Sequence, residues 1–94
     1  MKKIVAICGM GFGSSFVVST NIKSALKELG VTDIEVDHMD LGSGYPGVAD
    51  LIVCGDDLKD NCARLGDVMP LKNLFDKEEM RTKLSKILTE KGIL

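Results

Sequence analysis

Residues 4–15 of the chain read Ile4-Val5-Ala6-Ile7-Cys8-Gly9-Met10-Gly11-Phe12-Gly13-Ser14-Ser15. The apolar run at the start is typical of a strand that is buried on both faces. Glycine at alternate positions predicts a tight loop without crowding side chains, and the serine pair is typical of a helix start. A strand, a glycine loop and a helix N-terminus in this order indicate an anion-binding site, because free backbone N–H groups converge there and the helix dipole adds partial positive charge.

Cys8 stands where this strand ends and the loop begins. A helix N-terminus and converging amides both favour the charged form of a thiol. We therefore expect Cys8 to be an ionised nucleophile that handles a phosphoryl group. Backbone N–H groups, joined by two serine hydroxyls, are expected to bind the phosphate oxygens. The residues of this predicted cradle are Gly9, Met10, Gly11, Phe12, Gly13, Ser14 and Ser15.

The composition indicates one small cytoplasmic domain that spans residues 1–94. Hydrophobic residues make up 45% of the 94 residues, which is typical of a globular protein. No apolar run approaches the length of a membrane span, so we expect no direct insertion into a membrane. The net charge of −2, without a basic block, gives nucleic-acid binding no electrostatic support.

The cysteines and the histidine do not form a recognisable metal motif. Cys8, Cys54 and Cys62 are widely spaced, and His38 is the only histidine. A zinc site needs four ligands in a characteristic spacing. We therefore expect neither a metal nor a cofactor, and we expect free thiols in a reducing cytoplasm.

Strands and helices alternate along the chain. Apolar runs and alternating patterns predict strands at residues 3–7, 33–37, 50–54 and 68–71. Helical periodicity predicts helices from residue 14 or 15 to residue 29, over about residues 58–64, and from residue 77 to residue 91. We predict an α/β fold in which a four-stranded parallel sheet of order 2-1-3-4 carries helices on both faces. This order places a ligand at the carboxyl ends of the first and third strands.

Acidic residues mark the starts of the last two helices. Asp56 or Asp57 is expected to cap the short helix. Asp76 is expected to cap the last helix, and Glu79 stands three residues later, as in a capping box.

Other glycine-loop motifs fit the sequence less well. A dinucleotide-binding loop would carry glycine where Ser14 stands. An ATP-binding loop would contain Gly-Lys-Ser or Gly-Lys-Thr, and this loop has no lysine.

The loop at Cys8–Ser15 resembles that of the IIB subunits of the bacterial sugar phosphotransferase system (PTS). It is most similar to the ascorbate-type branch, whose loop reads Cys-Gly-x-Gly-x-Gly-Ser-Ser, and the resemblance extends to Ala49–Ile52 and Lys72–Phe75. It implies a phosphotransferase with a phosphocysteine intermediate: Cys8 accepts a phosphoryl group from a phosphohistidine on a IIA protein and passes it to a sugar. The sugar, L-ascorbate in this branch, is held by the membrane transporter IIC, and galactitol or another polyol is the alternative. The resemblance also implies the same four-stranded sheet and a position at the inner face of the membrane through IIC, and we expect a monomer.

The fold and loop also resemble the low-molecular-weight tyrosine phosphatases, which carry Cys-x5-Arg. Ser14 stands at the position of that arginine, and the first arginine of the chain is Arg64. A phosphatase stabilises its transition state with the arginine, whereas a carrier must protect its thiophosphate from water. We therefore expect weak or no phosphatase activity. A phosphatase-like hydrolase and a non-catalytic anion-binding or redox module are the alternative functions.

Several other side chains have competing interpretations. Cys54 ends its strand at the predicted site edge, so it either neighbours the site or packs in the core. Cys62 is expected to pack in the core, and His38 is expected to be a surface or structural residue rather than a phosphohistidine. Met10 and Phe12 are expected to contact a partner protein if the loop is exposed.

Overall fold

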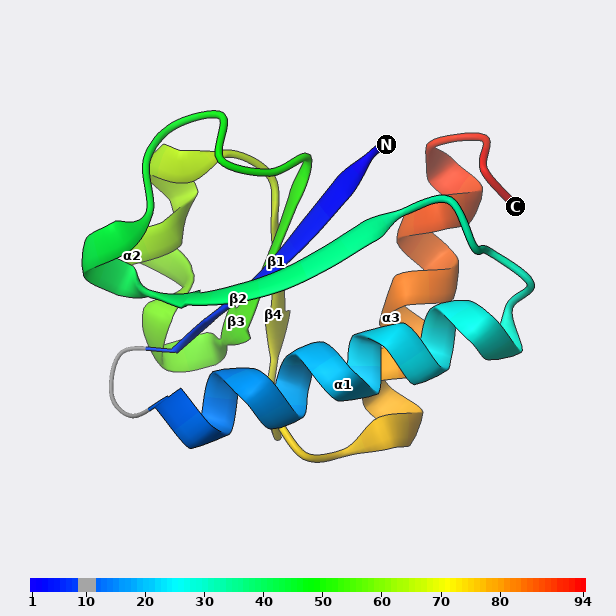
Figure 1. Cartoon of the computed structure of the whole chain (residues 1–94), viewed down its shortest axis with the longest axis horizontal. Helices are drawn as coiled ribbons and strands as arrows, with labels where there is room; N and C mark the ends of the chain where they lie inside the picture. Colours follow the sequence, from blue (N-terminus) through cyan, green and yellow to red (C-terminus); the bar gives the residue numbers. More distant parts are fainter. Residues whose placement is uncertain (9–11) are drawn as a thin grey trace.

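The computed structural model describes residues 1–8 and 12–94, with side chains in the first helix described from residue 15 onward. The chain folds into a parallel sheet flanked by helices (Figure 1). The elements in order are β1 (Lys3–Cys8), α1 (Phe12–Glu28), β2 (Glu35–Asp40), β3 (Leu51–Gly55), α2 (Lys59–Cys62), β4 (Val68–Leu71) and α3 (Lys77–Glu90). Single 3-10 turns cover Leu41–Ser43, Asp56–Leu58 and Ala63–Leu65.

The sheet has the strand order β2-β1-β3-β4, and every neighbouring pair is parallel. This confirms the predicted order. β1 and β3 are central, and β3 is buried along its whole length. β2 begins and ends later than the alternating pattern predicts, because its pairing with β1 continues from Glu35 to Asp40.

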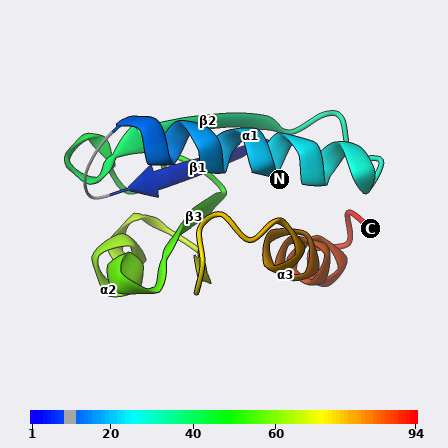
Figure 2. The same cartoon turned by 90° about the horizontal axis from the view of Figure 1, so that it is seen from below.

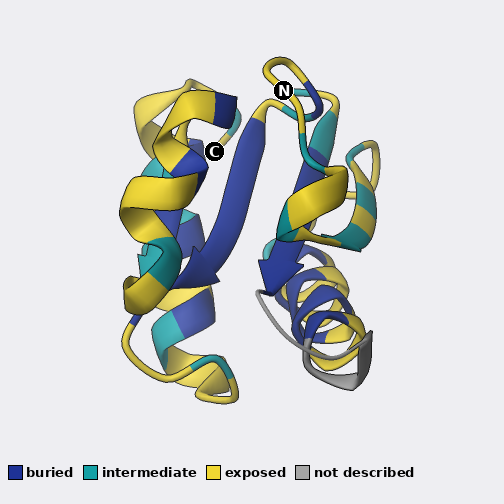
Figure 3. Cartoon of the chain, turned by 90° about the vertical axis from the view of Figure 1, so that its left-hand side faces the viewer, coloured by how far each residue is buried: buried dark blue, intermediate teal, exposed yellow. Residues whose placement is uncertain are grey.

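Helices cover both faces of the sheet, as predicted. α1 and α3 pack on one face, where Ile4 and Leu84 belong to a single buried cluster. α2 and the turns beside it cover the other face, where Val5 and Leu65 belong to a second cluster. Seen from below, α2 and α3 lie on opposite sides of β3 (Figure 2). The buried strands and the exposed outer faces of the helices are distinguished by colour in Figure 3.

One carboxylate aligns the two central strands. Asp50 accepts hydrogen bonds from the backbone N–H groups of Lys2 and Lys3 at 2.7 and 2.9 Å. These bonds lower the pKa of Asp50, because they stabilise the charged form. The starts of β1 and β3 are thereby tied side by side, so their carboxyl ends finish at the same edge of the sheet. Both chain termini lie at the opposite end of the molecule (Figure 1).

α1 begins two to three residues earlier than the serine pair predicts. Its first residue is Phe12, so Ser14 and Ser15 lie within its first turn and are not its N-cap. Its end agrees with prediction, since Gly30 adopts a φ of 77°, a left-handed conformation that glycine accepts without strain.

Candidate functional site

The candidate site lies at the carboxyl edge of the sheet, where β1, β3 and β4 end. β1 and β3 pair with Ala6 opposite Val53, so continuing the register brings Cys8 level with Gly55. β2 ends beside them, with Asp40 opposite Cys8. The structure therefore places Cys8 at the end of a central strand, as predicted.

The surroundings of Cys8 differ from the expected ones. The residue is only 6% exposed. Burial raises the pKa of its thiol, and the neighbouring Asp57 and Cys62 raise it further. This direction is opposite to the expected activation. Gly9, Met10 and Gly11, whose amides were expected to favour the thiolate, lie outside the described residues.

The remaining cradle residues belong to α1. Phe12, Gly13 and Ser14 form the start of the helix, and their side chains lie outside the description. Ser15 is buried, and its Oγ lies 3.3 Å from Nδ1 of His38. A helix of this length presents free N–H groups and partial positive charge at its first turn.

His38 lies closer to the candidate site than the sequence suggests. It is on β2, opposite Ala6 of β1, and its ring packs edge-on against Phe16 with 5.7 Å between ring centroids. The contacts with Ser15 and Phe16 join β2 to the first turns of α1. The predicted parallel pairing of β2 with β1 could have located this histidine, because it brings the end of β2 beside the start of α1.

Asp56 and Asp57 do not cap the short helix, which corrects the sequence prediction. The caps of this segment are Gly55 and Leu58, neither of which makes a side-chain cap hydrogen bond. Asp57 instead lies over Gly55: a Cβ at position 55 would stand 2.5 Å from Oδ1 of Asp57. Glycine at the end of β3 thus leaves room for a carboxylate that acts on Cys8.

A cavity of about 490 Å³ opens at this edge. We call it the carboxyl-edge cavity. Its walls come from the ends of β3 and β4 and from the segments that follow them: Gly55, Asp56, Asp57, Leu71, Lys72, Asn73, Leu74 and Phe75. It combines two acidic side chains, a lysine and an exposed aromatic ring, so it is suited to contact both charged and apolar groups.

Cys54 belongs to the core and not to the site. Side chains alternate along a strand, and Cys54 packs with Cys62 in the cluster beneath α2. Both side chains are fully buried. Burial and the adjacent Cys62 thiol raise the pKa of Cys54 to about 12.

The described residues contain neither a cluster of metal ligands nor a helix that could span a membrane. Among residues 1–8 and 12–94, no three His, Cys, Asp or Glu side chains are grouped as a metal site requires. None of the helices in that part of the chain has both the length and the apolar character of a membrane span. The described part of the site presents the Cys8 thiol at the end of β1, four residues before the start of α1.

Sequence comparisons point to a sugar phosphotransferase system. Residues 3–86 match the family model described as "PTS system, Lactose/Cellobiose specific IIB subunit". A curated relative, the ascorbate-specific PTS system EIIB component of Mycoplasma pneumoniae, is 32% identical over 88 residues. The match covers 90% of this chain and 93% of the relative.

Solved structures share the fold. The lactose-specific IIB component domain of the phosphoenolpyruvate:carbohydrate phosphotransferase system from Streptococcus pneumoniae superposes with a TM-score of 0.61 at 19% identity, covering 94% of this chain and 95% of that domain. A low-molecular-weight tyrosine phosphatase from Bacillus subtilis gives a TM-score of 0.59 at 11% identity, covering 94% and 97%. At these identities the two likenesses concern the fold alone.

Proposed function

This chain belongs to the family of PTS lactose/cellobiose-specific IIB subunits, and from that premise we propose that it is a phosphocarrier whose nucleophile is Cys8. A phosphohistidine on a IIA protein is the donor, and a sugar held by the membrane transporter IIC is the acceptor. The position of Cys8 at the carboxyl end of a central strand, ahead of α1, is the observation that carries the proposal.

Two in-line transfers make up the proposed reaction. In the first, the Cys8 thiolate attacks phosphorus, an S–P bond forms, and the N–P bond breaks as the histidine nitrogen takes its electron pair. In the second, a sugar hydroxyl attacks phosphorus, loses its proton to solvent or a base, and the S–P bond breaks to restore the thiolate. Such transfers depend on positioning and on electrostatic stabilisation of the phosphoryl oxygens.

In this proposal, the phosphoryl oxygens accept hydrogen bonds from the backbone N–H groups of residues 9–15 and from the hydroxyls of Ser14 and Ser15. A dianionic group at the first turn of α1 would be stabilised by the helix dipole. The described neighbours of Cys8 raise its pKa, so in this proposal the cradle amides are what favours the thiolate.

L-Ascorbate is the proposed sugar. Its support is the relative that is 32% identical and is named ascorbate-specific. Growth and labelled-sugar uptake on ascorbate, galactitol and lactose after deletion of the gene would test this choice. Loss of ascorbate uptake alone is expected, and unchanged ascorbate uptake with loss of another sugar would reassign the substrate.

The phosphocarrier proposal is tested by intact mass after incubation with a phosphorylated IIA protein. We expect wild type to gain one phosphoryl group and Cys8→Ser to gain none, because the hydroxyl is a far weaker nucleophile at neutral pH. Cys54→Ala is the matched control, since it removes a buried thiol from the core cluster and leaves in place the described groups that raise the pKa of Cys8. A phosphoryl group on Cys8→Ser would refute the assignment of the nucleophile.

A hydrolase is the alternative that the phosphatase fold raises. Ser14 stands where those enzymes carry arginine, so we expect no turnover of an aryl phosphate such as p-nitrophenyl phosphate above the buffer rate. Turnover at about 1 s⁻¹ or faster, within the usual range for enzymes, would favour the hydrolase.

A further inference from the structure

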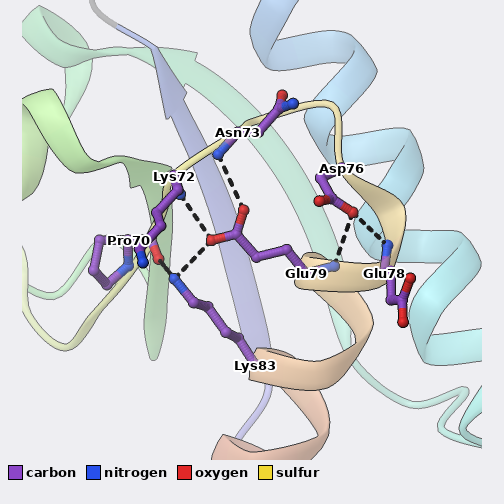
Figure 4. Close-up of polar contacts among 7 residues, drawn as sticks. All are labelled: Pro70, Lys72, Asn73, Asp76, Glu78, Glu79 and Lys83. Carbon is purple, nitrogen blue, oxygen red and sulfur yellow. Dashed lines mark hydrogen bonds and ion pairs between the residues drawn. The ribbon is translucent and has the colours of Figure 1, made fainter.

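Glu79 makes an unusual set of contacts for a residue in the first turn of a helix. Its Oε2 accepts a hydrogen bond from the backbone N–H of Lys72 at 2.8 Å, and its Oε1 accepts one from Asn73 at 3.0 Å. Nζ of Lys83 lies 2.8 Å from Oε2 and also donates to the carbonyl oxygen of Pro70 at 2.7 Å. Figure 4 shows the carboxylate between the helix and the chain that leaves β4.

These contacts determine the backbone of the segment Lys72–Phe75. The backbone N–H groups of Lys72 and Asn73 donate hydrogen bonds to the Glu79 carboxylate. The backbone N–H of Phe75 donates to the side-chain oxygen of Asn73 at 3.0 Å. The segment thus takes its conformation from side-chain acceptors rather than from a strand or helix ladder. Without the Glu79 carboxylate, two of its backbone donors lose their partners.

The same segment is a wall of the carboxyl-edge cavity. The lining of this cavity also includes Gly55, which is level with Cys8 in the sheet register, and Asp57, whose charge acts on the Cys8 thiol. Phe75, at the end of the segment, is 56% exposed. A protein that approaches Cys8 over this edge therefore meets a surface whose shape depends on Glu79.

The state of the carboxylate fits this role. The Glu79 side chain is 14% exposed. Hydrogen bonding to Lys83 and to the Lys72 N–H lowers its pKa to about 2, so it remains a charged acceptor throughout the physiological range. Charge-assisted hydrogen bonds of this kind are roughly twice as strong as neutral ones.

We propose that Glu79 is a positioning residue for phosphoryl transfer: it fixes Lys72–Phe75 as a docking wall for the phosphorylated donor protein. The inference rests on the proposed phosphocarrier function. Glu79 does not touch the reacting sulfur, so it acts on the affinity for the donor and not on the chemical step.

The test is steady-state phosphoryl transfer from a phosphorylated IIA protein through this chain to the sugar, with membranes that contain IIC as the acceptor. The kcat, the KM for the IIA protein and the KM for the IIC membranes are determined separately, and an increase in the KM for the IIC membranes alone would overturn the assignment of the donor protein. Glu79→Gln keeps the size of the side chain, loses one acceptor oxygen and loses the charge that pairs with Lys83. We expect this variant to raise the KM for the phosphorylated IIA protein by about 5- to 30-fold and to leave kcat within about twofold of wild type. Lys83→Met leaves the carboxylate in place and is expected to raise KM less.

Glu78→Gln is the matched control. This variant removes the same charge from the same helix turn. The described backbone N–H groups of Lys72 and Asn73 donate to Glu79 and not to Glu78, so the segment should keep its conformation. Wild-type KM is expected for it. If Glu79 only stabilised the fold, Glu79→Gln would reduce the fraction of active protein. The apparent kcat would then fall while KM stayed unchanged, so measuring the two constants separately distinguishes this case from a role in docking.

The outcomes separate the two proposals. If wild type accepts no phosphoryl group, the phosphocarrier function and this inference both fall. If wild type transfers normally and Glu79→Gln has an unchanged KM, or loses kcat alone, only the positioning role of Glu79 is overturned.

Discussion

The Cys8 thiol lies beside a carboxylate, and the two groups are coupled by charge. Asp57 raises the pKa of Cys8, because a nearby negative charge disfavours the thiolate. We expect Asp57→Asn to shift the pH profile of Cys8 alkylation by iodoacetamide toward lower pH. Asp60→Asn serves as the control, since it removes an equal charge from an exposed position on α2. A profile for Asp57→Asn that coincides with wild type would contradict this coupling.

The three thiols are expected to differ in reactivity in the folded protein. Cys54 and Cys62 are fully buried, and burial raises the pKa of both. Cys8 retains a small exposed area at the edge of the sheet. Iodoacetamide under native conditions should therefore label Cys8 first, and the other two only after unfolding in urea. Peptide mapping that finds all three labelled at equal rates would contradict the packing described for the core cluster.

At the scale of the helix, the Glu79 carboxylate links α3 to β4, and its pKa gives this link a pH dependence. The folded-state pKa is about 2, below the ordinary value of 4.5. A depressed carboxyl pKa adds stability that is complete above the ordinary value and is lost as the pH falls through the folded one. Glu79→Gln should therefore lower the urea midpoint at neutral pH, and the gap to wild type should shrink between about pH 4.5 and pH 2.

Glu78→Gln controls for the loss of helix-dipole charge, which affects both positions alike. Its urea midpoint should stay close to wild type at neutral pH. A gap between Glu79→Gln and wild type that does not change with acid would mean that the carboxylate contributes through packing rather than through charge.

The elements show where local pattern is sufficient and where it is not. Asp76 caps α3 as predicted, because its carboxylate accepts from the N–H groups of Glu78 and Glu79 two and three residues away. Glu79 does not complete the capping box, because the Asp76 N–H already donates to the carbonyl of Asn73. Its actual partners lie before the helix, in a segment whose position depends on tertiary packing.

At the scale of the whole molecule, two buried clusters lie on opposite faces of one sheet. Leu84 belongs to the cluster under α1 and α3, and Leu65 to the cluster under α2. Each Leu→Ala substitution should cost about 2–5 kcal/mol in unfolding free energy. Because the sheet separates the two sites, the double variant should lose the sum within about 0.5 kcal/mol. Urea melts of the four proteins measure this, and strong non-additivity would indicate one continuous core.

The topology could be derived from sequence because burial differs between the strands. The continuous apolar runs that became β1 and β3 require cover on both faces, which only central strands receive. The location of Cys8 follows from that order. The groups around it do not, because Asp57 follows β3 whereas the wall held by Glu79 follows β4, so they reach the edge from two separate connections. No local pattern reports which side chains meet there.

The Lys83 contact with Pro70 has a consequence beyond the site. β4 is an outer strand, and outer strands are templates for unwanted pairing with other chains. At Pro70 the backbone has no N–H to offer, and its carbonyl oxygen is already occupied by Lys83. A strand from another chain that paired with β4 would therefore meet no N–H donor at Pro70, and it would have to displace the Lys83 side chain from the Pro70 carbonyl oxygen. The rim of the sheet thus carries its own safeguard against edge-to-edge aggregation.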